Sequence, residues 1–292
     1  MKKKILIIFY VFLEVYLLFN SIDVINSFKN NLNIIIYTLM PSMFFSVLFT
    51  NILLKLEFYK YIPKFLLKFF SKILNINYEE VTIILLSIFG GFPINSKLLI
   101  NNKNINNIII YTSFVSPIYF FTTVNKVYLK NFKTSLTIYL SLLLSNLLIG
   151  YLVRNKNNNY KTKKEENVHN DIYFSSLKET IITLSNIFSN ILFFSILISL
   201  LNNIIKNKLI NNIICGLLEF SSGIYLISYS NISLFLKGLI ITIFISFNSF
   251  SIHIQLISIN EKIKYKKYLL YRIINIIISV IIYFILNILI SY

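Results

Sequence analysis

The feature that most constrains this chain is a series of apolar runs, each about 15 to 24 residues long, separated by short polar segments. About 20 apolar residues in a helix cross the hydrocarbon core of a bilayer. Of the 292 residues, 56% are hydrophobic and only 13% are charged, and the mean hydropathy is +0.72. This composition excludes a soluble globular domain and predicts an all-α protein that crosses a membrane several times.

The content of reactive side chains argues against metal and hydrolytic chemistry. Cys215 is the single cysteine, so the chain has no internal disulfide, and two histidines, His169 and His253, cannot supply a histidine-rich metal site. The sequence also lacks the His-Glu-x-x-His, Gly-x-Ser-x-Gly and Walker-type patterns. We expect no enzyme activity, no metal and no cofactor.

The net charge of +17 would suggest a nucleic-acid partner in a soluble protein. Here the positive charges lie mostly between the apolar runs, where they orient a membrane protein and contact anionic lipid. We therefore expect the lipid bilayer, and not nucleic acid, as the partner.

The runs divide the chain into four parts. Residues 1–31 hold an N-terminal apolar helix without a cleavage site, and residues 154–178 form a charged loop between two halves, 32–153 and 179–292. In the first half, lysines recur every four or five residues over 55–80, which predicts an amphipathic helix in the cytoplasmic interface.

Each half holds a short, interrupted apolar segment. Residues 81–99 are apolar until Gly90-Gly91-Phe92-Pro93, and residues 213–228 contain Glu219 and Gly223. Glycine frees the backbone and proline removes a donor, so we predict two re-entrant helical hairpins, with the glycines at positive φ or at close helix approaches. Paired broken segments in two halves indicate an inverted repeat.

A broken span follows each predicted hairpin. Residues 108–124 contain Ser113-Phe114-Val115-Ser116 followed by Pro117, and residues 239–259 contain Ser246-Phe247-Asn248-Ser249 at the corresponding place. The predicted fold is therefore two inverted repeats, each with the order span, hairpin, broken span, span.

Charge counting gives the orientation. If the N-terminus, residues 55–107, the central loop and residues 260–272 face the cytoplasm, 21 of the 28 basic residues lie inside and 7 lie outside. Asn31 and Asn131 are then expected on the outer side. The two hairpins would enter from opposite faces, so their tips, with Asn95 and Glu219, should meet near the midplane.

The hairpin tips carry the polar residues that could bind a solute. Glu219 lies at a depth where a carboxylate is costly, which indicates function, although pairing with a helix N-terminus or a lysine is the structural alternative. Asn95, Ser96 and Lys97 follow the first turn, where free amide groups at a half-helix N-terminus would attract an anion. Lys97 could instead reach the interface as a lipid-facing lysine.

Ser249, His253 and Gln255 lie in an otherwise apolar span. Ser249 and His253 share a helix face, while Gln255 is rotated from Ser249 by about 240° and from His253 by about 200°. All three can face one pocket only if the helix breaks near Asn248-Ser249. His253 has two interpretations, a ligand or proton role and a hydrogen bond between helices.

Four motifs in order resemble those of the YlbJ (SpoVV) sporulation integral membrane proteins. They are Phe89-Gly90-Gly91-Phe92-Pro93-Ile94-Asn95-Ser96-Lys97-Leu98, Ser116-Pro117-Ile118-Tyr119-Phe120, Gly216-Leu217-Leu218-Glu219-Phe220-Ser221-Ser222-Gly223 and the run from Ser246 to Gln255. The resemblance covers roughly residues 32 to 290. It implies the nucleoside-recognition, or gate-domain, fold of concentrative nucleoside transporters. It further implies export of dipicolinate from the mother cell toward the forespore.

The sequence thus predicts a multi-pass transporter of a small anionic or aromatic solute in the cell membrane or the outer forespore membrane. The alternatives are a non-transporting scaffold for spore envelope assembly and a nucleoside-type transporter. The coupling ion and the oligomeric state are left open. The expected substrate-binding residues are Gly90, Gly91, Phe92, Pro93, Asn95, Ser96, Lys97, Ser116, Pro117, Glu219, Ser221, Ser222, Gly223, Ser249, His253 and Gln255.

Overall fold

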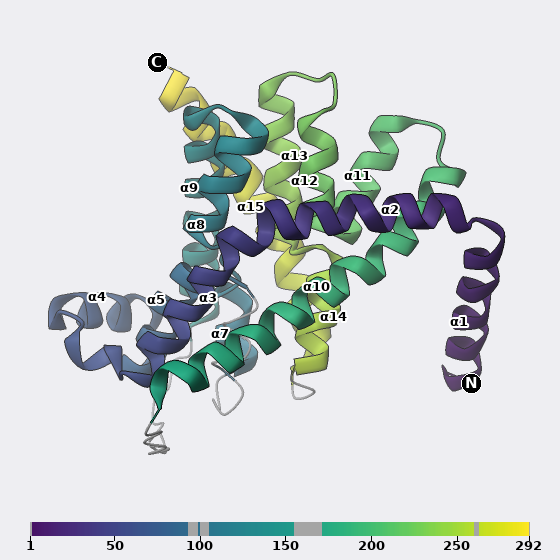
Figure 1. Ribbon diagram of the computed structural model, residues 1–292. Coiled ribbons are helices and arrows are strands. Elements are labelled where there is room, and N and C mark those ends of the chain that lie inside the picture. The colour runs from purple at the N-terminus through teal and green to yellow at the C-terminus, as the bar shows by residue number, and fades with distance from the viewer. Residues whose placement is uncertain (1, 93–98, 100–104, 155–170, 260–262, 292) are drawn as a thin grey trace.

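The computed structural model describes residues 2–92, 99, 105–154, 171–259 and 263–291 (Figure 1). Within these ranges every regular element is a helix. The expectation of an all-α membrane protein is confirmed at this level, because several helices are long and apolar enough to cross a bilayer. Among the described residues five helical segments meet that test: Ser21–Lys55, Phe132–Val153, Ile172–Ile204, Leu234–Ser258 and Tyr265–Ile290.

The N-terminal region differs from the prediction. Helix α1 (Lys2–Phe19) lies at one side of the molecule, where the Tyr16 hydroxyl accepts from the Asn203 side chain of the later chain (Figure 1). It is followed by α2 (Ser21–Ile34), the π-helix η1 (Ile35–Leu39) and α3 (Met40–Lys55). The predicted span from residue 32 therefore begins about one helix earlier, and Asn31 is buried inside α2 instead of lying in an outer loop.

The π-helix precedes Pro41, which lies at the start of α3. Proline lacks an N–H for the helical ladder, and its ring crowds the carbonyl group four residues earlier. A wider π-turn relieves both problems, so the chain continues through Pro41 as one long helical unit.

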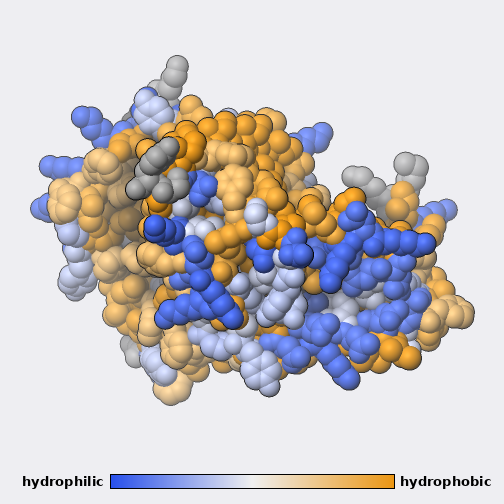
Figure 2. Space-filling view, turned by 90° about the horizontal axis from the view of Figure 1, so that it is seen from above, coloured by the Kyte–Doolittle hydropathy of each residue, from blue (hydrophilic) through white to orange (hydrophobic). Residues whose placement is uncertain are grey.

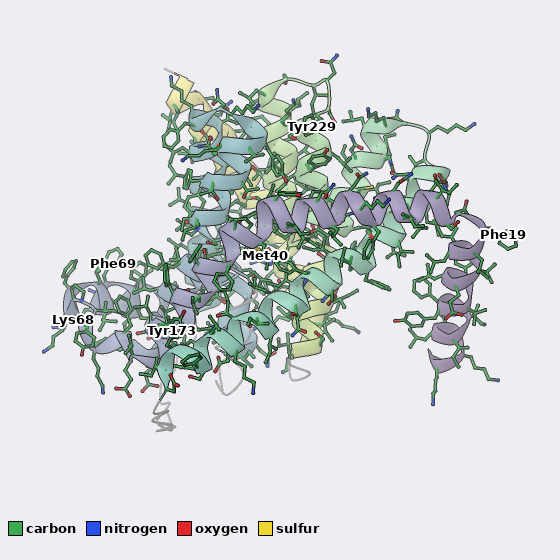
Figure 3. The ribbon with its side chains drawn as sticks, in the orientation of Figure 1. Phe19, Met40, Lys68, Phe69, Tyr173 and Tyr229 are labelled. Atoms are coloured by element: carbon green, nitrogen blue, oxygen red, sulfur yellow. The ribbon has the colours of Figure 1, made fainter. Side chains whose placement is uncertain are left out.

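The predicted interfacial helix forms in part of its expected range. A short 3-10 helix η2 (Phe58–Tyr61) leads to α4 (Lys64–Leu74), which bends by 97° into α5 (Tyr78–Gly90). Leu67 and Leu74 of α4 are buried, whereas Lys68 and Phe69 are exposed (Figure 3). This amphipathic pattern supports an interfacial position, which stays a prediction.

The first broken span has the expected interruption. Helix α7 (Ile105–Tyr111) ends before a non-helical stretch, 112–116, and α8 (Pro117–Tyr119) continues as the π-helix η3 (Phe120–Leu129). Pro117 occupies the first turn of α8, where a missing N–H costs nothing. Helix α9 (Phe132–Val153) then crosses the molecule as predicted.

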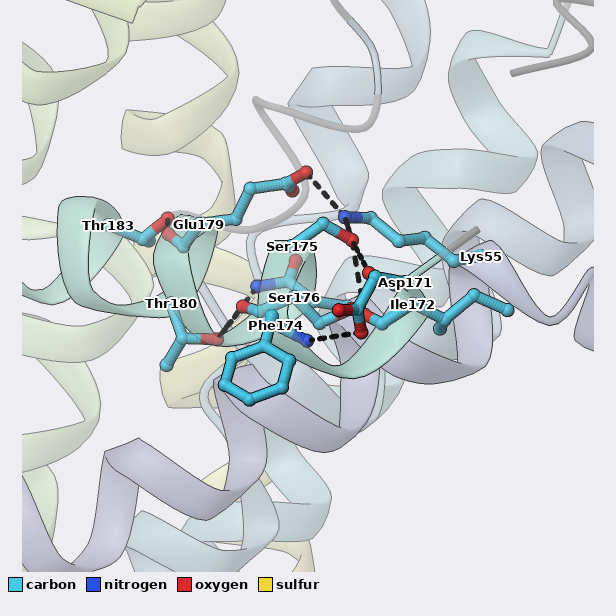
Figure 4. Close-up of polar contacts among 10 residues, drawn as sticks. Lys55, Asp171, Ile172, Phe174, Ser175, Ser176, Glu179, Thr180 and Thr183 are labelled. Atoms are coloured by element: carbon cyan, nitrogen blue, oxygen red, sulfur yellow. Dashed lines mark hydrogen bonds and ion pairs between the residues drawn. The ribbon is translucent and has the colours of Figure 1, made fainter. Parts of the chain in front are cut away.

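Helix α10 (Ile172–Ile204) begins earlier than predicted, so the last seven residues of the expected charged loop are helical. The Asp171 side chain caps the new helix start by accepting from the Phe174 N–H. Lys55, at the end of α3, contacts the same turn: its Nζ lies 2.8 Å from Glu179 Oε1 and 2.8 Å from Ser175 Oγ (Figure 4). These contacts join the first and second halves of the chain.

The second half continues with two short helices, α11 (Lys208–Leu218) and α12 (Phe220–Ser228), which pack closely against each other. Helices α13 (Leu234–Phe247) and α14 (Ser249–Ile259) form one apolar unit that is interrupted at Asn248, as predicted. Helix α15 (Tyr265–Ser291) ends the described chain.

Helices α9, α13 and α15 pack against one another. The outer surface of α15 is apolar, with Ile273, Ile277 and Ile281 about half exposed, as a lipid-facing helix requires. Seen from above, hydrophilic side chains gather on part of the face and hydrophobic side chains occupy much of the rim (Figure 2). The internal repeat and the re-entry of the hairpins into the membrane stay predictions.

The orientation can be tested by cysteine labelling in a Cys215→Ala background. The N-terminus and the start of α10 lie at the lower side in Figure 1, and the start of α9 and the α12–α13 loop lie at the upper side. We expect a membrane-impermeant thiol reagent to label Asn231→Cys and Lys130→Cys from outside intact cells, but to reach Asp171→Cys only after permeabilisation. The reverse pattern would contradict the predicted orientation. Asn31 cannot serve as an outer probe because it is buried.

Candidate functional site

Two adjoining cavities lie where the α11–α12 turn meets the breaks in the other helices. Counted together with the open space at their mouths, the larger has about 420 Å³ of empty volume and the smaller about 320 Å³. Met43, Phe92, Phe220 and Ile252 line both cavities, so the two spaces share a wall. The larger is otherwise lined by Gly90, Phe114, Val115, Ser116, Tyr119, Ile245 and Asn248, and the smaller by Leu39, Ile187, Ile191, Glu219, Ser221, Ser251 and Gln255.

The end of α5 is fixed against the first helix break. Gly91 has φ +73°, a conformation that glycine adopts without strain, and a Cβ atom there would lie 2.7 Å from the Ser116 nitrogen. The Phe92 N–H donates to the Phe114 carbonyl at 2.8 Å. The Ser116 Oγ is 3.0 Å from the Ser46 Oγ of α3. These contacts place Phe92 and Ser116 at the larger cavity.

Glu219 forms the turn between α11 and α12. Its backbone is extended, with φ −143° and ψ 114°, and its side chain caps α12. Oε1 accepts from the Ser221 N–H at 3.0 Å, and Oε2 accepts from the Ser222 N–H at 2.6 Å. The side chain is fully buried. This is the structural pairing with a helix N-terminus that the sequence left open, and the same residue also lines the smaller cavity.

Two glycines allow α11 and α12 to approach. A Cβ atom on Gly223 would collide with the Gly216 Cα atom, so neither helix can carry a larger residue at this crossing. The Gly216 carbonyl accepts from the Ser249 Oγ at 2.6 Å. The expected close approach at Gly223 is confirmed, and Ser249 attaches the hairpin to the break between α13 and α14.

The break between α13 and α14 separates the three polar residues of this span. Asn248 and Ser249 both have positive φ, 69° and 31°. Gln255 then lines the smaller cavity. His253 is outside both cavity walls: its Nε2 lies 2.9 Å from the Phe247 carbonyl oxygen and its Nδ1 lies 3.2 Å from the Tyr265 hydroxyl. These contacts favour the alternative in which His253 joins helices.

A buried arginine lies behind the cavities. Arg272 of α15 donates to the carbonyl groups of Ile110 and Ser246, in the last turns of α7 and α13, and to Asn146 Oδ1 at 3.1 Å. It is fully buried, although the charge count placed it at the cytoplasmic surface. The Asn275 side chain also donates to Asn146 and Ser246. This network holds the ends of both broken helices.

Several predicted site residues lie outside the described residues. They are Pro93, Asn95, Ser96 and Lys97. The expected meeting of Asn95 and Glu219 therefore stays a prediction. Of the others, Ser222 contacts Glu219, while Pro117 begins α8 and is partly exposed.

Two residues at the site, Asn31 and Tyr119, were not among the predicted site residues. Asn31 contacts the Ser222 hydroxyl, and its amide donates to the Ser27 carbonyl at 3.0 Å. The spacing of Ser27 and Asn31 could have identified Asn31, because the two residues are one helical turn apart and share the buried face of α2. Tyr119 packs edge-on against Phe220 at 6.0 Å between ring centres.

Comparisons with protein-family models, curated proteins and solved structures found no match for this chain. The resemblance to the sporulation proteins therefore depends on the four sequence motifs. Residues from all four lie at the two cavities: Gly90 and Phe92 from the first motif, Ser116 and Tyr119 from the second, Glu219, Phe220 and Ser221 from the third, and Asn248, Ser251, Ile252 and Gln255 from the fourth.

Proposed function

We propose that this chain is a membrane transporter that carries a small aromatic solute through the two adjoining cavities. The observation that supports the proposal best is the meeting of both helix breaks and the α11–α12 turn at two adjoining, mainly apolar cavities. Broken helices at membrane depth are tolerated where they line a cavity.

The cavity walls fit an aromatic ring with a polar edge. Phe92, Phe114 and Phe220 supply aromatic surface. The hydroxyl groups of Tyr119 and Ser221 are buried beside each other and beside Glu219, and neither makes a hydrogen bond of normal geometry with a described residue. Buried donors without partners are costly, and a carboxylate or carbonyl group on a solute would satisfy them.

The motif resemblance makes dipicolinate, a planar pyridine dicarboxylate, the first solute to test. A nucleoside is the second candidate, because the described walls contain no lysine or arginine that would select an anion. A scaffold for envelope assembly would have no need of unsatisfied hydroxyl groups at an internal cavity.

Uptake of labelled solutes into proteoliposomes tests the proposal. We expect dipicolinate to enter faster than in protein-free vesicles and to be outcompeted by unlabelled dipicolinate, because the aromatic walls and free hydroxyl groups would bind it. Glutarate, a dicarboxylate without a ring, is the matched control and should not compete. Saturable entry of uridine in place of dipicolinate would assign the nucleoside alternative. Entry of neither solute, in vesicles whose protein is folded, would favour the scaffold.

A further inference from the structure

The contacts around Glu219 need one more proton than the side chains of its neighbours supply. The Ser222 Oγ lies 2.7 Å from Glu219 Oε2 and is also in hydrogen-bond contact with Asn31 Oδ1. A serine hydroxyl carries one proton and can donate to only one of these two oxygens. The second contact therefore requires a proton from another group.

The Asn31 amide does not supply this proton. Its Nδ2 donates to the Ser27 carbonyl at 3.0 Å. Turning the amide over would direct a donor at Ser222, but it would place Oδ1 against the Ser27 carbonyl oxygen, so two acceptors would face each other. The orientation that satisfies Ser27 leaves Oδ1 directed at Ser222.

The surroundings of Glu219 also fail to balance a carboxylate. The side chain is fully buried, and within the described part of the chain no lysine, arginine or histidine is in contact with it. An unpaired buried carboxylate is costly, and two backbone N–H groups offset only part of that cost. The groups that face this region are Asn31 from α2, Tyr119 from α8, Tyr128 from η3, Ile187 and Ile191 from α10, Cys215 from α11, and Ser251 and Gln255 from α14.

We propose that Glu219 is protonated in this state and is the proton-binding site of the protein. With the proton on Oε2, Glu219 donates to the Ser222 Oγ and Ser222 donates to Asn31 Oδ1, so both contacts are hydrogen bonds. Loss of the proton leaves a negative charge in the wall of the smaller cavity and removes the hydrogen bond from Glu219 to Ser222. The role of the proton in transport rests on the proposed function.

This arrangement couples the proton to an anionic solute. A carboxylate on Glu219 would repel a solute carboxylate in the same cavity, whereas the neutral acid would not. The proton and an anionic solute therefore occupy the cavities together. Uptake is expected to fall as the pH rises and Glu219 ionises, and to recover when the pH is lowered.

Infrared difference spectroscopy of the purified protein in lipid tests the proton directly, without a solute. We expect a C=O stretching band from a protonated carboxyl group at neutral pH that is absent from Glu219→Gln and unchanged in Glu57→Gln, an exposed glutamate on the surface. In Ser222→Ala, which keeps the carboxyl group, the band should shift because one hydrogen bond is lost. A wild-type spectrum without a band that Glu219→Gln removes would overturn the proposal.

The uptake assay provides the second readout. Wild-type uptake of dipicolinate should decline with rising pH, and uptake by Glu219→Gln should be the same at acidic and alkaline pH, because glutamine cannot ionise. Glu57→Gln should keep the wild-type pH profile. If the infrared band is present but no solute is taken up, the result supports the proton site and rejects the transport function. A pH profile in Glu219→Gln that matches the wild type would reject the coupling role.

Discussion

Replacing Arg272 by Met should destabilise the protein by about 1 to 3 kcal/mol, the usual cost of leaving a buried hydrogen-bond acceptor without its donor. Arg272 is fully buried and donates to carbonyl groups at the ends of α7 and α13. Each helix C-terminus carries about half a negative charge, so two of them together balance one guanidinium group. Methionine fills a similar space but donates no hydrogen bond, and it leaves Asn146 without this donor.

Denaturant unfolding in mixed micelles measures this change. Lys266→Met is the matched control, because Lys266 is exposed on the same helix, and it should change the unfolding free energy by less than about 0.5 kcal/mol. Arg272→Lys keeps the charge but loses the planar fork that reaches several acceptors, so its stability should lie between those of the wild type and Arg272→Met. Equal stability of Arg272→Met and Lys266→Met would show that Arg272 does not hold the helix ends.

Helix positions were predictable because apolar length and helix-breaking residues act locally. The spans at α9 and α15, the interruption before Pro117 and the break at Asn248 all follow from residues within one or two turns. The start of α2 was not predictable in this way. Its sequence is rich in asparagine and serine, and Ser27 and Asn31 make tertiary contacts from its one buried face.

The sequence indicated some of the residues of the candidate site, but it did not indicate which of them would be in contact. Glu219 was identified because a carboxylate between apolar residues is costly, but nothing in the sequence showed that Asn31 would contact Ser222 from 191 residues away. The sequence also contains a pattern that indicates burial of Arg272, although the charge count placed this residue at the cytoplasmic surface. Tyr268, Arg272, Asn275 and Ser279 recur at spacings of three and four, which places a polar stripe on one face of an apolar helix. All four are buried.

Uptake by a variant with a larger side chain in the wall shared by the two cavities tests whether the solute passes through them. Ile252 lines both cavities, so the phenyl ring of Ile252→Phe would occupy space that the solute needs. Ile257, on the same helix, is 42% exposed, and Ile257→Phe makes the same chemical change away from the cavities.

We expect Ile252→Phe to lower dipicolinate uptake by at least about tenfold, equivalent to about 1.4 kcal/mol, while Ile257→Phe keeps the wild-type rate. Uptake is normalised to the amount of folded protein, since overpacking alone can cost about 1 to 3 kcal/mol of stability. Equal uptake by wild type, Ile252→Phe and Ile257→Phe would contradict a solute path through these cavities.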